Sequence, residues 1–168
     1  MLTGKGGEIM PRLGGFVLIA LFAVCIALSG CNKPAAEIEI TLDVDECADV
    51  LLETIAFQDI LTAVSDEMAT TLYQISEQDA VKQKVYVSSG ATAEEIAVFE
   101  AADAVAAKRI EKAVLQRVAE QQASFKDYLP AELPKLNDPF ILVRDKYVIL
   151  CISDDNEKVK TKLDRLFN

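Results

Sequence analysis

The side chains that could do covalent or acid–base chemistry in this chain are thiols, hydroxyls and carboxylates. The sequence has four cysteines, 27 acidic residues and no histidine. The lack of histidine excludes His-based catalytic triads, His-ligated zinc and histidine acid–base catalysis. Any chemistry must therefore come from a cysteine, from carboxylates, or from a serine activated by a lysine.

Cys31 is the cysteine with the most informative surroundings. An apolar run at 16–28 precedes it, basic residues lie before that run, and the small residues Ser29 and Gly30 lie between the run and the thiol. Charged, apolar and small residues in this order are typical of a secretory signal. The run is shorter than the roughly 20 apolar residues that a membrane-spanning helix needs. We therefore predict a signal peptide at 1–30.

The stretch Leu28-Ser29-Gly30-Cys31 resembles the lipobox of bacterial lipoproteins. In that class a diacylglyceryl group is attached to the cysteine thiol, and a peptidase then cuts the chain directly before the cysteine. The resemblance implies cleavage between Gly30 and Cys31, a lipidated Cys31 and a tether at 31–42. Two or more acyl chains would anchor the protein stably, at about 0.8 kcal/mol per buried methylene. The implied location is the outer face of the bacterial cytoplasmic membrane; an uncleaved anchor helix is the alternative.

Two thiols, Cys47 and Cys151, then remain for other roles. An even pair outside the cytoplasm can form a disulfide, and closing a loop of roughly 100 residues would add about 4–5 kcal/mol of stability. Both also fit an apolar core as small residues. Cys47 lies on the apolar face of an expected helix and Cys151 within an apolar strand. The sequence leaves both interpretations open.

Two clusters of acids could bind a metal or transfer protons, but both lie where a helix is expected to begin. The first could hold calcium, yet it lacks the central glycine of an EF-hand loop and suits the positive end of a helix. The second could pair carboxylates, yet a capping box explains Asp154 and Glu157. The clusters comprise Asp43, Asp45, Glu46 and Asp49, and Asp154, Asp155 and Glu157. We assign no metal ligand and no catalytic residue to them.

Hydroxyl and aromatic side chains give weaker indications. Ser88, Ser89 and Thr92 flank an expected turn, and without histidine only a lysine such as Lys84 could activate a serine. Five aromatic residues could line a ligand groove, although alternating aromatics on strands more often belong to the core. These are Tyr86, Phe99, Tyr128, Phe140 and Tyr147. No cofactor site is predicted.

The elements that would position these groups follow from apolar spacing. Helical spacing predicts helices at 43–57, 65–75, 104–129 and 154–167. Strand patterns predict hairpins at 81–101 and 140–152, with a proline-rich loop at 129–139. The segment 93–101 also fits a helix by propensity, but a single helix from 92 to about 127 would be unusually long.

Residues 43–168 are therefore expected to form a single α+β domain. Two N-terminal helices are followed by two β-hairpin–helix units, which form an antiparallel four-stranded sheet with helices on one face.

Three stretches in the body carry a further resemblance. SSGATAEEIAVFEA, FKDYLP and YVILCISDD follow the lipobox in this order, and they resemble a family of Gram-positive, clostridial-type lipoproteins with a single domain of unknown function. The resemblance covers about 44–166 and implies a strand at 93–101. The family has no assigned activity, so the resemblance implies no catalytic residues.

The net charge of −10 argues against nucleic acid as a partner, because phosphate binding needs clustered lysine and arginine. The hypothesis that fits these features best is a lipid-anchored binding or interaction module of the cell envelope, contacting an envelope protein or the cell wall. The alternative is an extracytoplasmic enzyme that uses carboxylate or Ser/Lys chemistry.

Overall fold

The computed structural model describes residues 41–167, which belong to a compact unit spanning Ile40–Asn168. Gly30, Cys31, the predicted signal peptide and nearly all of the predicted tether lie outside the described residues. Within the described part, none of the helices is both long enough and apolar enough to cross a membrane.

The described residues form five α-helices, one 3-10 helix and five strands. The helices are α2 (Val44–Thr54), α3 (Asp66–Tyr73), α4 (Ala104–Tyr128), α5 (Leu133–Asn137) and α6 (Asn156–Leu166), with the 3-10 helix η1 (Pro130–Glu132) before α5. The strands are β1 (Thr62–Ala63), β2 (Ala80–Val87), β3 (Glu95–Ala101), β4 (Phe140–Arg144) and β5 (Tyr147–Ile152). The class is α+β, as predicted.

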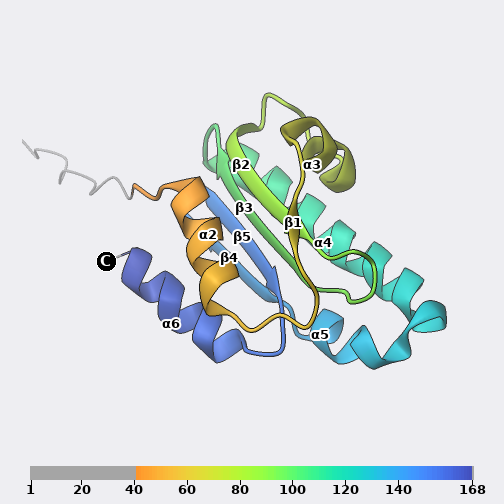
Figure 1. Cartoon of the computed structure of the whole chain (residues 1–168). Coiled ribbons are helices and arrows are strands. Elements are labelled where there is room, and N and C mark those ends of the chain that lie inside the picture. Colours follow the sequence, from red (N-terminus) through yellow and green to blue (C-terminus); the bar gives the residue numbers. More distant parts are fainter. Residues whose placement is uncertain (1–40, 168) are drawn as a thin grey trace, which may run out of the picture. The chain divides into compact units, whose positions relative to one another are not determined.

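The strands form one antiparallel sheet in the order β1-β2-β3-β5-β4 (Figure 1). β3 lies at its centre, where Val98 is opposite Lys84 of β2 on one side and Ile149 of β5 on the other. The prediction of four strands is wrong, because β1 adds a fifth at the edge. With two residues, β1 is too short to show strand alternation.

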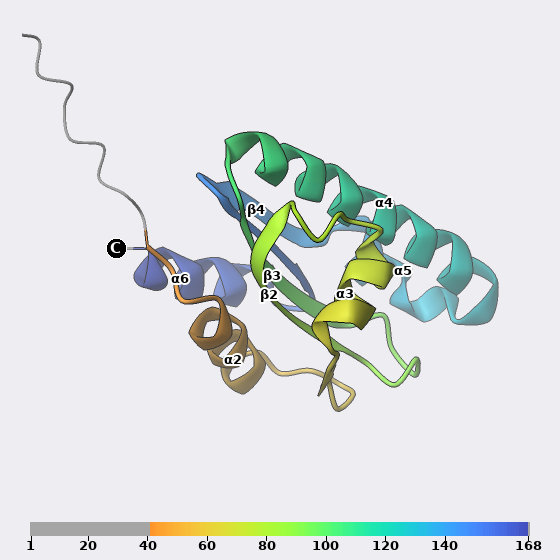
Figure 2. The same ribbon diagram turned by 90° about the horizontal axis from the view of Figure 1, so that it is seen from above.

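Helices cover both faces of the sheet (Figure 2), so the prediction of one covered face is also wrong. α2 and α6 pack on one face through buried residues such as Leu51 and Leu163. α3 and α4 pack on the other face through residues such as Tyr73 and Ile110. All six residues of β5 and nearly all of β3 are buried. Strands that are apolar on both sides require cover on both.

The two N-terminal helices exist, but the prediction that they follow each other directly is wrong. β1 lies between them, and α3 packs on the opposite face of the sheet from α2. Asp43 caps α2 by accepting hydrogen bonds from two backbone N–H groups, and Ser65 caps α3 by accepting from one. Capping residues thus fixed where each helix begins but not the layer in which it packs.

The remainder of the fold agrees with the sequence patterns except in the proline-rich segment. The strand at 93–101 is confirmed, and Asp103 caps α4. The segment 129–139 is not an irregular loop, because it contains η1 and α5. Proline is well suited to the first turn of a helix, where its missing N–H costs nothing.

Candidate functional site

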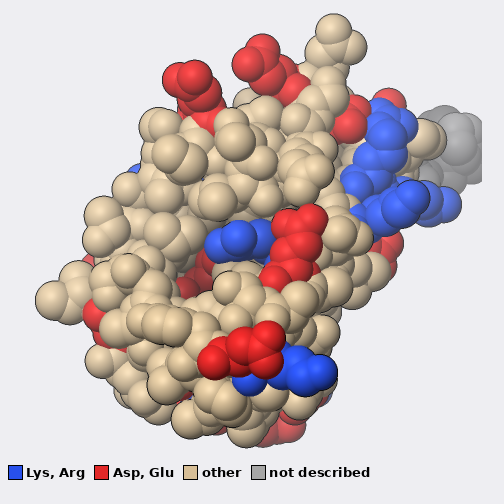
Figure 3. All heavy atoms as spheres, turned by 90° about the vertical axis from the view of Figure 1, so that its right-hand side faces the viewer, with Lys and Arg blue, Asp and Glu red and all other residues tan. Residues whose placement is uncertain are grey.

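A cavity of about 330 Å³ lies on the α4 side of the sheet, between α3, α4 and the loop that joins β2 to β3. Leu72 and Phe125 supply apolar walls, and Ser88, Ser124 and Glu120 supply polar groups. The surface in Figure 3 is hollowed near its middle, where a basic side chain meets acidic ones. The cavity is thus lined by both apolar and charged groups, as ligand sites usually are.

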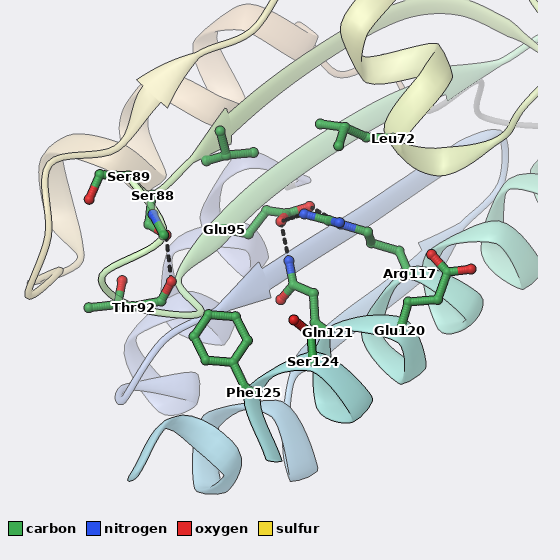
Figure 4. Close-up of a pocket in the computed structure, with 12 residues that line it drawn as sticks. Leu72, Ser88, Ser89, Thr92, Glu95, Arg117, Glu120, Gln121, Ser124 and Phe125 are labelled. Atoms are coloured by element: carbon green, nitrogen blue, oxygen red, sulfur yellow. Dashed lines mark hydrogen bonds and ion pairs between the residues drawn. The ribbon is translucent and has the colours of Figure 1, made fainter. Parts of the chain in front are cut away.

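Glu95 lies at the floor of this cavity, although its strand is otherwise largely apolar. Its side chain is 1% exposed. Its carboxylate accepts hydrogen bonds from Arg117 Nη2 at 2.8 Å and Nε at 3.3 Å, from Gln121 Nε2 at 2.5 Å, and from the Tyr73 hydroxyl. Figure 4 shows Glu95 between Arg117 and Gln121 of α4. The buried carboxylate therefore accepts hydrogen bonds from three side chains, one of which is the Arg117 cation.

The surroundings fix the protonation of the partners of Glu95. Burial alone would lower the pKa of Arg117, but the hydrogen bond and charge of Glu95 outweigh it and the pKa is raised. Burial and the nearby Glu95 carboxylate raise the pKa of Tyr73 well above its ordinary value. Arg117 is charged and Tyr73 is a protonated donor at neutral pH. The floor is consequently a neutralised ion pair.

Gln121 has an acceptor that the protein leaves unused. The residue is 7% exposed, and its Nε2 is engaged by Glu95. Its Oε1 is buried and has no hydrogen-bond partner within 41–167. Figure 4 shows this oxygen pointing away from Glu95, on the side where Ser124 and Phe125 lie. Gln83 Oε1 and Asn156 Oδ1 are in the same state. A buried polar atom without a partner costs about 1–3 kcal/mol, so a donor from a ligand or from an ordered water would stabilise Gln121 Oε1.

A second buried ion cluster contains Lys135 of α5. Its Nζ lies 3.1 Å from Glu94 Oε1 and 3.1 Å from Glu132 Oε2. The three side chains are 4%, 0% and 8% exposed, respectively. Burial alone would lower the pKa of Lys135, but the hydrogen bonds and charges of the two glutamates outweigh it and the pKa is raised. Lys135 thus stays charged in the interior.

This second cluster supports the rim of the cavity. Glu94 accepts hydrogen bonds from the backbone N–H groups of Gln58, at 2.9 and 3.0 Å, and of Asp59, at 3.0 Å. Asp59 Oδ2 in turn accepts from the backbone N–H of Ser89 at 2.8 Å and from its hydroxyl at 2.6 Å. Ser89 lines the cavity. A chain of hydrogen bonds therefore connects Glu94 to the loop at the rim.

The structure separates the predicted serine nucleophiles from their predicted base. Ser88 and Ser89 line the cavity, and Ser88 Oγ donates to the carbonyl of Thr92 at 2.5 Å. Lys84 instead lies toward α2, with its Nζ 4.0 Å from Asp45 Oδ1 and 5.4 Å from the centre of the Tyr86 ring. No Ser–Lys pair forms from these residues.

The predicted acid clusters have other partners. Asp43 and Asp45 lie 3.3 and 2.8 Å from Lys82 Nζ. The capping prediction at α6 is wrong by one residue, because Asp155 rather than Asp154 caps the helix, accepting from the N–H of Lys158. No group of three or more potential metal-ligating side chains occurs among the described residues.

Cys47 and Cys151 are free thiols in the same buried cluster. Burial raises the pKa of each thiol to about 12, and Cys151 contributes further to the shift at Cys47. Both occupy the apolar positions that the sequence pattern gives them, and the disulfide stays the alternative that the sequence leaves open.

The five predicted aromatics do not line the cavity. Phe99 and Tyr147 are buried in the core, and Tyr128 is 69% exposed. Tyr86 and Phe140 are partly buried against the cluster under α2 and α6. The aromatic residue that does line the cavity is Phe125, one turn of α4 after Gln121.

Sequence reasoning also missed the charged residues of both clusters. A signal for the first was present, because Gln121 interrupts the apolar stripe formed by Val114, Val118 and Phe125 on α4. Glu95, directly after Glu94, similarly begins an apolar strand. A polar residue on a buried face needs a partner, but the sequence does not identify which.

A family model described as a domain of unknown function, DUF4358, matches residues 54–153. This range includes the cavity, Glu95 and Arg117, and both members of the Glu94–Lys135 pair. No match was found among the curated proteins or the solved structures. The match covers more than half of the chain, so this chain belongs to the DUF4358 family.

Proposed function

We propose that this chain is a lipid-anchored ligand-binding protein of the bacterial cell envelope. The observation that carries the binding function is the cavity between α3, α4 and the β2–β3 loop, whose lining includes Gln121 with its buried, unpartnered Oε1. The floor of the cavity is held by the Glu95–Arg117 ion pair. A preformed, partly apolar cavity with a few directed polar groups favours binding.

The anchor rests on the resemblance of Leu28-Ser29-Gly30-Cys31 to a lipobox. It is consistent with the resemblance of the body to clostridial-type lipoproteins. Lipidation at Cys31 would hold the domain at the outer face of the cytoplasmic membrane. There the cavity would meet ligands of the cell wall or of the medium.

The enzyme alternative has less support from the geometry. Ser88 and Ser89 donate to a carbonyl and to the Asp59 carboxylate, respectively, and neither has a lysine beside it within the described part. Glu95 is surrounded by donors from Tyr73, Arg117 and Gln121, so its oxygens are already engaged. Acid–base catalysis needs a group within hydrogen-bonding reach of the substrate.

Native mass spectrometry tests the binding function. The full-length protein is purified from the membranes of its native host, together with Ser124→Trp, which fills the cavity. Ala123→Trp is the matched control, because Ala123 is exposed on the same helix and does not line the cavity. We expect a bound small molecule in the wild type and in Ala123→Trp only. Equal occupancy in all three proteins would overturn the proposal.

Lipidation is tested separately by metabolic labelling with an alkyne fatty acid. We expect Cys31→Ala to lose the label and to retain the signal peptide. Cys25→Ala is the control, since it changes a neighbouring thiol within the predicted signal. Labelling of Cys31→Ala at the wild-type level would exclude the anchor.

A further inference from the structure

We propose that the cavity binds a neutral ring that carries hydroxyl groups, such as one or two sugar units. This inference rests on the proposed ligand-binding function of the same cavity, and it specifies the chemistry of the ligand.

The polar groups that face the ligand call for hydroxyls. Gln121 Oε1 is a buried acceptor with no partner within 41–167, and a ligand donor that reaches it would satisfy it. Ser124, one turn further along α4, lines the cavity, and no hydrogen bond of its hydroxyl within the described part is seen. A ligand hydroxyl can donate to the glutamine and also exchange a hydrogen bond with the serine.

The charges at the cavity disfavour an ionic ligand. Arg117 is neutralised by Glu95, at 2.8 Å, so it attracts an anion only weakly. Glu120 lies on the cavity wall, where its Oε1 accepts hydrogen bonds from two glutamines, and its negative charge opposes an anion. A cationic group near Glu120 would in turn lie close to the Arg117 guanidinium. A neutral ligand avoids both conflicts.

The apolar walls and the size of the cavity complete the description. Leu72, Val87 and Phe125 can contact the C–H face of a sugar ring. A wholly apolar ligand would fill the same space but would leave Gln121 Oε1 without a donor. The volume of about 330 Å³ lies at the low end of the range of about 300–1,000 Å³ for ligand pockets. One or two rings would fill it.

Four probes of similar size distinguish the ligand classes. They are methyl β-glucoside, methyl β-glucuronoside, methyl β-glucosaminide and methoxycyclohexane, which are neutral, anionic, cationic and apolar, respectively. Each is titrated into the full-length protein in a phosphocholine detergent, which carries no sugar, and followed by saturation-transfer NMR and calorimetry. We expect the glucoside to bind at least about tenfold more tightly than the other three.

Three variants locate the binding. Gln121→Met should weaken glucoside binding about tenfold, while Gln122→Met, which changes a glutamine that does not line the cavity, should leave it unchanged. Ser124→Ala should weaken it severalfold without altering a buried contact, so the test holds even if Gln121→Met folds poorly. Ser124→Trp should abolish it.

The outcomes separate this inference from the function on which it rests. Preferential binding of a charged or apolar probe that Ser124→Trp abolishes would overturn the ligand class and leave the binding function standing. Binding of none of the four, or binding that Ser124→Trp does not affect, would overturn both.

Discussion

Glu94 and Glu95 are consecutive buried carboxylates, and each meets a cation of its own. Glu94 contacts Lys135 of α5 at 3.1 Å, and Glu95 contacts Arg117 of α4 at 2.8 Å. Side chains alternate along an extended chain. Two adjacent residues at the start of the central strand therefore bind two different helices, Glu94 binding α5 and Glu95 binding α4. The floor and the rim of the cavity depend on one dipeptide.

Arg117→Met should destabilise the domain strongly, because it leaves the Glu95 carboxylate buried without its cation. Removing one partner of a buried ion pair lowers the free energy of unfolding by about 3–5 kcal/mol. Urea unfolding followed by circular dichroism measures this loss. Arg109→Met is the matched control on the same helix. Its pair with Asp79 is shorter, at 2.6 Å, but the arginine is 54% exposed, so we expect a loss of at most about 1 kcal/mol. Equal losses would contradict the assigned role of burial.

Lys135→Met should leave two carboxylates, those of Glu94 and Glu132, buried without their cation. We expect a loss of about 3–5 kcal/mol and faster amide hydrogen exchange at Ser89, because Glu94 supports the rim. Lys82→Met removes an exposed ion pair with Asp43 and Asp45 and should change stability by less than about 1 kcal/mol. Unchanged exchange at Ser89 in Lys135→Met would show that the rim is held independently of this cluster.

Acidification should release the rim at Asp59. Hydrogen bonds from Ser89 lower the pKa of the Asp59 carboxyl from its ordinary value of 3.8. A lowered folded-state pKa stabilises the fold above the unfolded-state pKa, and this stabilisation is lost as the pH falls through the folded-state pKa. Asp59→Asn should therefore lower the melting temperature at pH 6, and the difference from wild type should vanish well below pH 3.8. A difference that is constant with pH would exclude the carboxylate as its cause.

Cys47 and Cys151 should be unreactive toward iodoacetamide in the folded protein at pH 8. Both are fully buried, and burial raises the pKa of each thiol to about 12, so almost no thiolate is present or accessible. Peptide mapping should find both thiols alkylated in denaturant without a reductant. Alkylation only after addition of a reductant would instead establish the disulfide between them.

The sequence predicted the elements well because the signals for them are local. Asp103 caps α4, Ser65 caps α3, and the turn at Gly90 separates β2 from β3. Each signal acts within a few residues of chain. The layer assignment failed although β3 and β5 carried the information, since their continuous burial is typical of a strand covered on both faces.

The site could not be predicted in the same way, because its contacts are distant in sequence. Glu95 meets Arg117 only after β3 and α4 have packed together, and Glu94 meets Lys135 through the packing of α5. Residue type alone suggested a pair of a serine with Lys84. In the structure, Lys84 lies toward α2 while Ser88 and Ser89 line the cavity. Which charges meet is decided by tertiary packing.

The central position of β3 also determines how the chain folds. β2 and β3 can close as a local hairpin, but pairing of 95–100 with 147–152 must wait until the whole of α4 and α5 has been spanned, and such non-local pairings form slowly. Until then the segment YVILCI, which is entirely buried in the native sheet, can pair locally only with β4, and its other edge stays open. It is uncharged and rich in β-branched residues, as aggregation-prone segments are. The time needed to close the middle of the sheet therefore sets the interval in which newly made chains are most prone to aggregate.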